Sequence, residues 1–408
     1  MDNKLLDKNN IKLTKKILLK YKLCDSCLGR LFAKIGKGQL NKTRGRNLRK
    51  ATGLKKIQDN NCWLCEGLIL EIPDFADIVK EKLSDYEFNS FLIGSKLGGD
   101  ILQREEELIN FSKSKFSEPI KMEINREVGK ILEKELKTTV SFEKPDITAI
   151  IDASFNIVDL QITSLYVYGR YKKYKRDIPQ TKWPCNICRG IGCRSCNFSG
   201  RLYENSVEEL IGKRFLEITE AKEESFHGCG REDIDALMLG NGRPFVLEIK
   251  NPVKRKISFK KIQKEINESN KEIVEVNNLR FSNKEEIIRL KNAEYNKTYR
   301  ILIECEKQIK KEKLKEVALL LPGTTIRQFT PTRVAHRRAN MVREKKIYDC
   351  KIESIEGTIA RLVLEAQSGT YIKELVSGDD QRTQPNISDM IENPCKVLQL
   401  DVIEIKGE

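Results

Sequence analysis

The segment from Phe226 to Glu248 carries the side chains best suited to chemistry. It contains the run Gly230-Arg-Glu-Asp233 and a second carboxylate at Asp235. Glycine lets the backbone approach a ligand closely, and a carboxylate on an exposed turn can act as a nucleophile or stabilise a developing cation. Taken alone, however, the pattern favours a structural turn in which Asp233 caps backbone N–H groups. The chemical interpretation depends on further motifs.

Eight of the twelve cysteines form four C-x-x-C pairs. Each pair can place two thiolates on one ion, so two pairs complete a tetrahedral zinc site. In a chain without a signal-peptide pattern, this pairing indicates metal binding rather than disulfides. We expect one zinc site from the first four of these cysteines and another from the last four: Cys24, Cys27, Cys62, Cys65, Cys185, Cys188, Cys193 and Cys196.

Both zinc sites are expected to be structural, because four thiolates leave no coordination position for water. The alternative for the first cluster is a set of unrelated free thiols. In the second cluster only four residues separate the two pairs, so ligands from elsewhere or from another chain are a further alternative. The remaining cysteines stand alone: Cys229, Cys305, Cys350 and Cys395.

The charge balance favours a polyanionic partner. Lys and Arg number 75 against 60 Asp and Glu, a net charge of +15 that is spread along the chain. Neutralising phosphates releases counterions, which suits RNA, although a lysine-rich soluble surface is an equal alternative on charge alone. Tyr166–Arg176 interleaves aromatic and cationic side chains, as RNA-binding surfaces do. The alternative for this segment is an edge strand with its aromatic face in the core.

Several other functions lack their motifs. Zinc deaminases carry H-x-E upstream of P-C-x-x-C, whereas both histidines, His227 and His336, lie downstream of Pro184–Cys188. No G-x-x-x-x-G-K-[ST] run is present, and Gly190-x-Gly192 leads into cysteines, so neither a nucleotide-driven reaction nor a Rossmann cofactor is supported. The longest aliphatic stretch, Val317–Leu321, is too short to span a bilayer. We expect a cytoplasmic protein without membrane association or a nucleotide cofactor.

Three regions are expected to position these residues. Residues 1–85 contain basic helical pieces and an amphipathic run at Ile72–Leu83, which indicates a zinc-binding module. Residues 86–200 alternate short strands with a charged helix at Lys121–Leu136 and end in the second cysteine cluster, which predicts an α+β accessory domain. Residues 201–408 predict a large sheet domain with helices on a face. The expected strands are Phe91–Ile93, Ala149–Ile151, Leu165–Val167, Pro244–Ile249, Tyr299–Ile303, Lys351–Ile355 and Ala360–Glu365.

The run Gly230-Arg-x-Asp233 resembles the G-R-x-D loop of pseudouridine synthases. The longer segment around it is similar to the archaeal and eukaryotic tRNA pseudouridine synthases of the Pus-ten family. Lys297-Thr-Tyr-Arg-Ile is similar to the tyrosine strand of that family, and Ser368–Asp379 with Arg382-Thr-x-Pro385 is similar to its last motif. Tyr166–Trp183 resembles the domain junction of the archaeal members.

The matches follow the family's order along the chain, throughout most of the second half and in patches of the first. One departure lies in the last motif. Relatives often have His-Gly-Asp-x-Gly-Arg there, whereas Ser377 and Gln381 stand in this chain. This departure concerns how the substrate fits at that motif rather than the chemistry.

The resemblance implies an isomerase that converts uridine to pseudouridine in the T-arm of tRNA, at positions fifty-four and fifty-five. Asp233 is then the catalytic carboxylate, selected over Asp235 by the G-R-x-D register, with a covalent and a glycal route both open. No cofactor is expected for catalysis, and zinc is expected only as a structural metal. The base must leave its helical stack to reach such a site.

The resemblance also implies roles for four further residues. Arg231 would fill the space left by the extruded nucleotide, and Tyr299 would stack on the uracil. Tyr371 would line the other side of the pocket. Lys373, two residues later and so on the same face of an expected strand, would pair with Asp233. The alternatives are a strand tyrosine that faces the core and a surface lysine.

The implied fold is α+β. An N-terminal zinc-stapled accessory domain would contain a THUMP-type RNA-binding module, and residues 201–408 would form a pseudouridine synthase domain with a mixed, largely antiparallel sheet. The expected partner is tRNA. Two alternatives stand beside this hypothesis: a non-catalytic, zinc-containing tRNA-binding protein in which Asp233 is inert, and another THUMP-type tRNA-modifying enzyme.

Overall fold

The computed structural model describes residues 4–35, 38–337 and 339–407. The chain forms two compact units. Unit 1 comprises Met1–Thr163 with Val253–Arg255, and unit 2 comprises Ser164–Pro252 with Lys256–Glu408. The three-part division at residues 85 and 200 stays a prediction.

Unit 1 begins with a helical module. Its helices α2 and α3 cross so closely that only glycine fits at the crossing. A Cβ at Gly29 would lie 1.9 Å from the carbonyl oxygen of Asn41, and one at Gly45 would lie 1.8 Å from that of Asp25. The elements are α1 (Lys8–Lys20), α2 (Asp25–Arg30), α3 (Asn41–Thr52), the short turns η1 (Asp59–Asn61) and η2 (Leu68–Glu71), and α4 (Ile72–Leu83).

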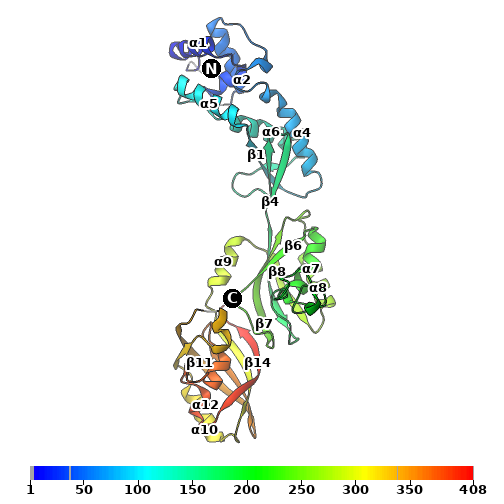
Figure 1. The fold of residues 1–408 in the computed structure, drawn as a ribbon, viewed down its shortest axis with the longest axis vertical. Helices are drawn as coiled ribbons and strands as arrows, with labels where there is room; N and C mark the ends of the chain where they lie inside the picture. The colour runs from blue at the N-terminus through cyan, green and yellow to red at the C-terminus, as the bar shows by residue number, and fades with distance from the viewer. Residues whose placement is uncertain (1–3, 36–37, 338, 408) are drawn as a thin grey trace. The chain divides into compact units, whose positions relative to one another are not determined.

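The rest of unit 1 is a four-stranded sheet packed against α4 and α6 (Figure 1). Its strand order is β2-β1-β3-β4, with β1 parallel to both β2 and β3. The buried Arg30 of α2 forms ion pairs with Glu123, at 3.0 Å, and with Glu105, at 3.7 Å, and so joins the helical module to this layer. The elements are β1 (Ser90–Lys96), α5 (Gly99–Ser112), α6 (Ile120–Leu136), β2 (Thr139–Val140), β3 (Ile147–Asp152) and β4 (Ile157–Ile162).

Unit 2 is built on one mixed sheet of order β13-β10-β11-β12-β9-β14-β7-β5-β8, with β6 paired to β7. Neighbouring strands are antiparallel except β14 and β7, so the predicted mixed, largely antiparallel sheet is confirmed. The strands are β5 (Leu165–Lys173), β6 (Glu223–Gly228), β7 (Leu237–Lys250), β8 (Val274–Phe281), β9 (Lys297–Cys305), β10 (Thr325–Phe329), β11 (Val342–Glu356), β12 (Ile359–Ala366), β13 (Thr383–Gln384) and β14 (Cys395–Ile405).

Helices cover this sheet, and α7 and α8 lie together on one side of it (Figure 1). Alternate residues along the strands face the core, which continues beneath the helices, as β9 shows with Tyr299, Ile301 and Ile303 buried. The helices and turns are η3 (Arg194–Cys196), α7 (Val207–Thr219), α8 (Phe259–Ser269), α9 (Lys284–Asn292), α10 (Lys311–Leu320), η4 (Thr332–Arg337), α11 (Ile372–Ser377) and α12 (Ile387–Met390).

Strand β5 corrects one expectation. The segment Tyr166–Arg176 was predicted to contact RNA, with an edge strand as the alternative, but β5 lies inside the sheet of unit 2, between β7 and β8. Tyr171 and Lys173 are fully buried, and the guanidinium of Arg170 donates to the carbonyl oxygens of Asn241 and Gly242. At these positions both faces of the strand are covered, so Arg170, Tyr171 and Lys173 do not face solvent. Tyr174, just beyond the strand, is 38% exposed, and its contact with RNA stays a prediction.

Two of the four cysteines expected to stand alone are paired. Cys305 of β9 and Cys395 of β14 form a disulfide. They are 90 residues apart in sequence and become neighbours because the two strands pair in antiparallel register. Spacing along the chain carries no signal for this contact.

Candidate active site

The loop 229–236, between β6 and β7, lines a cavity of about 810 Å³ in unit 2. The predicted catalytic and substrate-binding residues all line this cavity: Arg231, Asp233, Tyr299, Tyr371 and Lys373. They come from the loop, from β9 and from the start of α11, and sheet pairing brings these segments together. A cavity of about 910 Å³ beside α7 and α8 has none of the five in its lining.

Two cations face the Asp233 carboxylate, which is about one-third exposed. Lys373 Nζ lies 3.4 Å from Asp233 Oδ2, and Arg333 Nη1 lies 3.5 Å from it. Lys373 is closer to Asp235, at 2.9 Å. Burial raises the pKa of Asp235, but the hydrogen bond and charge of Lys373 outweigh it and lower that pKa overall. No motif pointed to Arg333, which lies in η4 and is oriented by the buried Glu374 at 2.7 Å.

A buried ion pair holds the loop from below. Glu232 and Arg243 are both about 1% exposed, and Glu232 Oε2 lies 2.8 Å from Arg243 Nε. The Tyr171 hydroxyl donates to Glu232 at 2.8 Å, and Gln180 Nε2 donates to the Tyr171 hydroxyl and to the Gly230 carbonyl oxygen. Arg243 also donates to the carbonyl oxygen of Cys229 at 2.7 Å. The residue immediately before Asp233 is therefore anchored in the core.

The backbone on the other side of Asp233 is held by a buried lysine. Lys173 Nζ donates to the carbonyl oxygens of Ile178 at 2.9 Å, Ile234 at 3.0 Å and Asp233 at 3.4 Å. Burial lowers the pKa of Lys173. Both sides of the loop are thus fixed by the core while the Asp233 side chain points to the cavity, which is the arrangement expected of a preorganised site.

The two tyrosines differ in their surroundings. Tyr299 is 8% exposed on β9, and burial raises its pKa to about 12, although the nearby Arg243 opposes that rise. Its phenol is therefore neutral near pH 7. Tyr371 precedes α11, and its backbone N–H and carbonyl are both bonded to the buried amide of Gln328 at 2.9 Å.

The prediction that Tyr371 and Lys373 lie on a strand is wrong. Strand β12 ends at Ala366, a turn with Gly369 at φ +79° follows, and Tyr371 caps α11. Lys373 therefore reaches the carboxylates from the first turn of a helix and not from the face of a strand.

Arg231 contacts an aromatic residue that the sequence did not single out as part of the site. Its guanidinium carbon lies 4.7 Å from the centroid of the Trp183 ring, and both residues line the cavity. A cation over an indole face is an attractive arrangement. Trp183 stands two residues before the first cysteine of the second cluster, so the chain runs from the cavity wall directly into that cluster.

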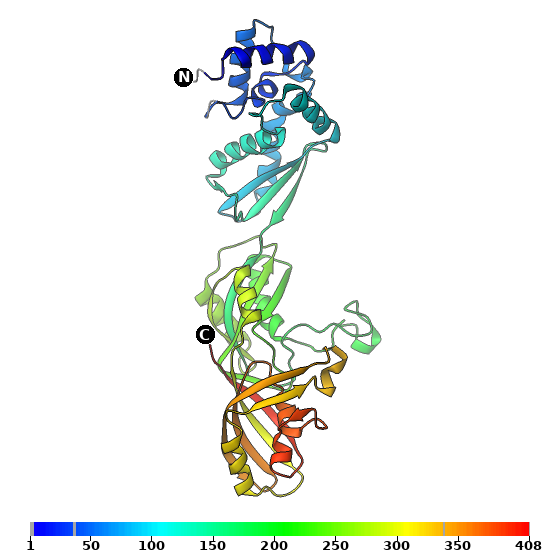
Figure 2. The ribbon, with the colours of Figure 1, turned by 90° about the vertical axis from the view of Figure 1, so that its left-hand side faces the viewer.

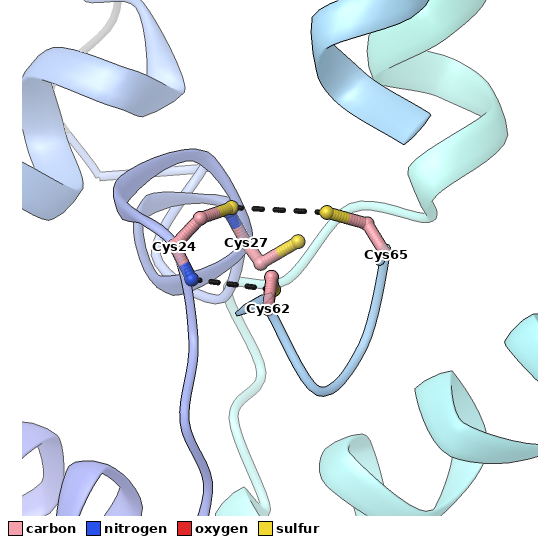
Figure 3. A group of neighbouring side chains, drawn as sticks. All are labelled: Cys24, Cys27, Cys62 and Cys65. Carbon is pink, nitrogen blue, oxygen red and sulfur yellow. Dashed lines mark hydrogen bonds between the residues drawn. The ribbon is translucent and has the colours of Figure 1, made fainter. Parts of the chain in front are cut away.

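Each predicted cysteine cluster is assembled. The sulfur atoms of Cys24, Cys27, Cys62 and Cys65 lie within 4.8 Å of one another and converge in the core of unit 1 (Figure 3). Hydrogen bonds with the three neighbouring thiols, together with burial, raise the pKa of Cys27 well above its ordinary value. A coordinated cation would reverse this effect, because metals deprotonate coordinating thiols. The donor set therefore fits structural zinc.

The second cluster spans a shorter stretch of chain, Cys185–Cys196, and three of its four cysteines are partly exposed. Its four sulfur atoms also lie within 4.8 Å of one another, so ligands from elsewhere are not needed to complete a tetrahedron. Backbone N–H groups of Gly192 and Gly200 donate to Cys188 Sγ and Cys196 Sγ, each at 3.2 Å. Such N–H···S bonds favour thiolates. Both clusters thus offer the four-sulfur set that zinc prefers.

Comparison with known proteins places the chain in a family. The family model described as "Pus10, C-terminal" matches residues 166–406, and the one described as "Pus10 THUMP domain, archaeal" matches residues 75–152. A tRNA pseudouridine synthase Pus10 from Methanocaldococcus jannaschii is 40% identical over 95% of this chain and 93% of its own. Its counterpart from Methanothrix thermoacetophila is 38% identical over 94% of this chain and 92% of its own.

The chain belongs to the Pus10 family of tRNA pseudouridine synthases. As a member it is an enzyme of the isomerase class, and the resemblance inferred from the motifs is confirmed. The THUMP domain expected in the N-terminal half is confirmed as well. Among the helices of the described residues, none combines the length and hydropathy of a membrane span.

Likenesses to solved structures are distant. A Cbf5-Nop10-Gar1 complex has 16% identity and a TM-score of 0.30, over 49% of this chain and 45% of the other. A pseudouridylate synthase has 10% identity and a TM-score of 0.21, over 70% and 84%. These scores are too low to inform on the fold or the site.

Lys297 is a residue of the cavity to which the sequence assigned no role. It is 8% exposed, and its Nζ lies 3.3 Å from Ser368 Oγ. No carboxylate of the described residues forms an ion pair with it. Burial, with a smaller contribution from Arg243, lowers its pKa to about 8.

Lys297→Met is expected to stabilise the protein at pH 7 and to lose this advantage by pH 10.5. Between pH 8 and 10.5 the unfolded chain binds a proton at Lys297 that the folded chain does not bind. The stability of the unmutated protein therefore rises with pH across this window, by about 3 kcal/mol, and the variant lacks that rise. Urea unfolding at both pH values measures the difference. The exposed Lys284→Met is the control, and a stability difference independent of pH would contradict the expectation.

Proposed function

We propose that the chain isomerises uridine to pseudouridine in the T-arm of tRNA, with Asp233 as the catalytic carboxylate. The observation that carries this proposal is the Asp233 side chain itself: it faces the cavity from a loop whose backbone is fixed on both sides by buried polar groups. The other carboxylates of the cavity are already paired. Glu232 forms a buried ion pair with Arg243, and Asp235 lies closer to Lys373 than Asp233 does.

The reaction exchanges one glycosidic bond for another. The N1–C1′ bond breaks with its electron pair going to N1, the uracil turns, and C5 bonds to C1′. The proton on C5 then passes to water, and N1 takes up a proton from water. Asp233 serves either by attacking C1′ or by assisting a glycal route. The neutral ring of Tyr299 stacks on the extruded base, and Tyr371 bounds the cavity on another side, so the base is held while it turns.

The remaining cavity cations bind the nucleic acid. Arg333 and Lys373 keep positive charge beside Asp233. Arg231 fills the place of the extruded nucleotide, and its stacking on Trp183 holds it in the wall of the cavity. The THUMP domain, matched at residues 75–152, contacts the body of the tRNA. Positions fifty-four and fifty-five are the proposed target uridines.

Zinc has a structural role in this proposal. The two four-cysteine clusters each hold one ion, which cross-links the segments that carry its ligands and supplies no step of the reaction. Metal analysis of the purified protein is expected to find two zinc ions per chain. Cys185→Ser with Cys188→Ser is expected to leave one, because the first cluster shares no ligand with the second. A content unaffected by this double substitution contradicts the second site.

The test of the function uses unmodified tRNA transcript that carries tritium at uridine C5, without added cofactor. Pseudouridine formation releases this tritium to water, and mapping of the product by primer extension after carbodiimide treatment locates the modified uridines. Release with modification in the T-loop is the expected result. Tight tRNA binding without release would reduce the chain to a binding protein, and release from another arm would overturn the assigned position.

A further inference from the structure

The second cysteine cluster forms a protruding loop whose base lies at the active-site cavity. We call residues 184–202 the knuckle. Its two ends are joined by bonds from Leu202 N to the Trp183 carbonyl oxygen, at 3.0 Å, and from Cys185 N to that of Gly200, at 2.7 Å. Figure 2 shows it, in green, standing away from the sheet of unit 2. Since Trp183 lines the cavity, the knuckle begins beside the site.

The surface of the knuckle combines apolar and cationic side chains. Ile187, Ile191 and Phe198 are 71%, 91% and 73% exposed. Arg189 and Arg194 are exposed too, and neither forms an ion pair with any of the residues that the structure describes. The run 183–203 contains no Asp or Glu. Such an exposed, acid-free patch is unusual for a surface without a partner.

The backbone of the knuckle is fixed in shape. Gly192 has φ +100°, and a Cβ there would lie 2.7 Å from the carbonyl oxygen of Phe198. Gly200 has φ +71°, and a Cβ there would lie 2.4 Å from that of Gly190. Tight turns of this kind need glycine, and they hold the exposed side chains in place before a partner arrives.

We propose that the knuckle binds the strand of substrate RNA that adjoins the extruded uridine. This inference rests on the proposed function and adds a second contact beside the cavity. RNA is favoured over a protein partner for two reasons: the patch carries cations without acids, which matches phosphates, and it is continuous with the cavity through Trp183 and Arg231. Phe198 offers a ring on which a base stacks, and the arginines meet the backbone.

The test measures the affinity of the full-length chain for fluorescently labelled, unmodified tRNA transcript at several salt concentrations. Arg189→Ser with Arg194→Ser is expected to weaken binding about tenfold or more at 0.15 M salt. The slope of log K against log salt is expected to fall by about 1.4 to 1.8, the value for two lost phosphate contacts. Phe198→Ala is expected to weaken binding about tenfold without changing the slope.

The matched control is Lys311→Ser with Lys315→Ser, which removes the same charge from exposed positions on α10. An unchanged zinc content shows that the knuckle of each variant is folded. The proposal is overturned if the knuckle variants bind tRNA with the affinity and salt slope of this control, whether or not the patch then binds a protein. The measured quantity is binding and not product, so failure of the isomerase assay leaves this result interpretable.

Discussion

Replacing Asp233 with Asn is expected to lower the rate of pseudouridine formation by about 10⁴-fold or more, while the Kd for tRNA changes by less than about threefold. The amide has the size of the carboxylate but can neither attack C1′ nor balance a developing positive charge, and loss of a nucleophile costs factors of this order in other enzymes. Binding survives because the phosphate contacts lie elsewhere. Single-turnover tritium release and anisotropy titration give the two quantities.

Asp235→Asn is the matched control for this substitution. It lies two residues away, lines the same cavity and pairs with Lys373 at 2.9 Å. Its loss frees Lys373 to move fully toward Asp233, so we expect the rate to fall by less than about tenfold. If Asp235→Asn were the inactive variant and Asp233→Asn the active one, the assignment of the catalytic carboxylate would be reversed.

Glu232→Gln is expected to lower the free energy of unfolding of unit 2 by about 3–5 kcal/mol, because it leaves the fully buried Arg243 cation without its partner. The rate is expected to fall by about 10²-fold as well, since the loop that carries Asp233 loses its anchor. The chain has two tryptophans, Trp63 in unit 1 and Trp183 in unit 2. In a Trp63→Phe background, urea unfolding followed by fluorescence therefore reports on unit 2 alone.

The control for Glu232→Gln is Glu265→Gln, which removes one of the two carboxylates that pair with Arg214 at the surface, at 2.7 Å, the other being Glu217 at 2.8 Å. Arg214 and Glu265 are both about one-third exposed, so water and salt screen the interaction, and its loss is expected to cost much less stability than loss of the buried pair. Equal losses from the two substitutions would show that the pair beneath the loop does not hold it.

Local periodicity located many of the elements correctly. The amphipathic run Ile72–Leu83 is helix α4 with the same bounds, and the charged stretch Lys121–Leu136 is α6 with one added residue. In both, apolar residues recur at helical spacing and one face packs on a sheet, so the pattern and the packing agree. The strand predicted at Tyr299–Ile303 lies within β9 for the equivalent reason at period two.

Contacts between segments distant in the chain could not be predicted from the sequence. From its sequence, strand β5 resembles an RNA-binding stretch. In the fold its cations Arg170 and Lys173 donate to backbone carbonyls instead, and only the folded sheet supplies these partners. Cys305 meets Cys395 through strand register, and Arg333 reaches Asp233 across 100 positions. None of these pairings leaves a periodic trace, since each depends on which strands become neighbours.

The sequence by itself determined which residue types form the candidate active site and the cysteine clusters, and it determined their local geometry. The Gly230–Asp233 turn and the C-x-x-C pairs are short-range features, because each is set by residues within a few positions of one another. Only the tertiary structure decided how the Asp233 carboxylate is held and what faces it. The buried pair of Glu232 and Arg243, the carbonyls gathered by Lys173, and the cations of Arg333 and Lys373 come from separate strands and helices. Burying such charges is favourable only when the whole sheet closes around them and supplies every partner at once.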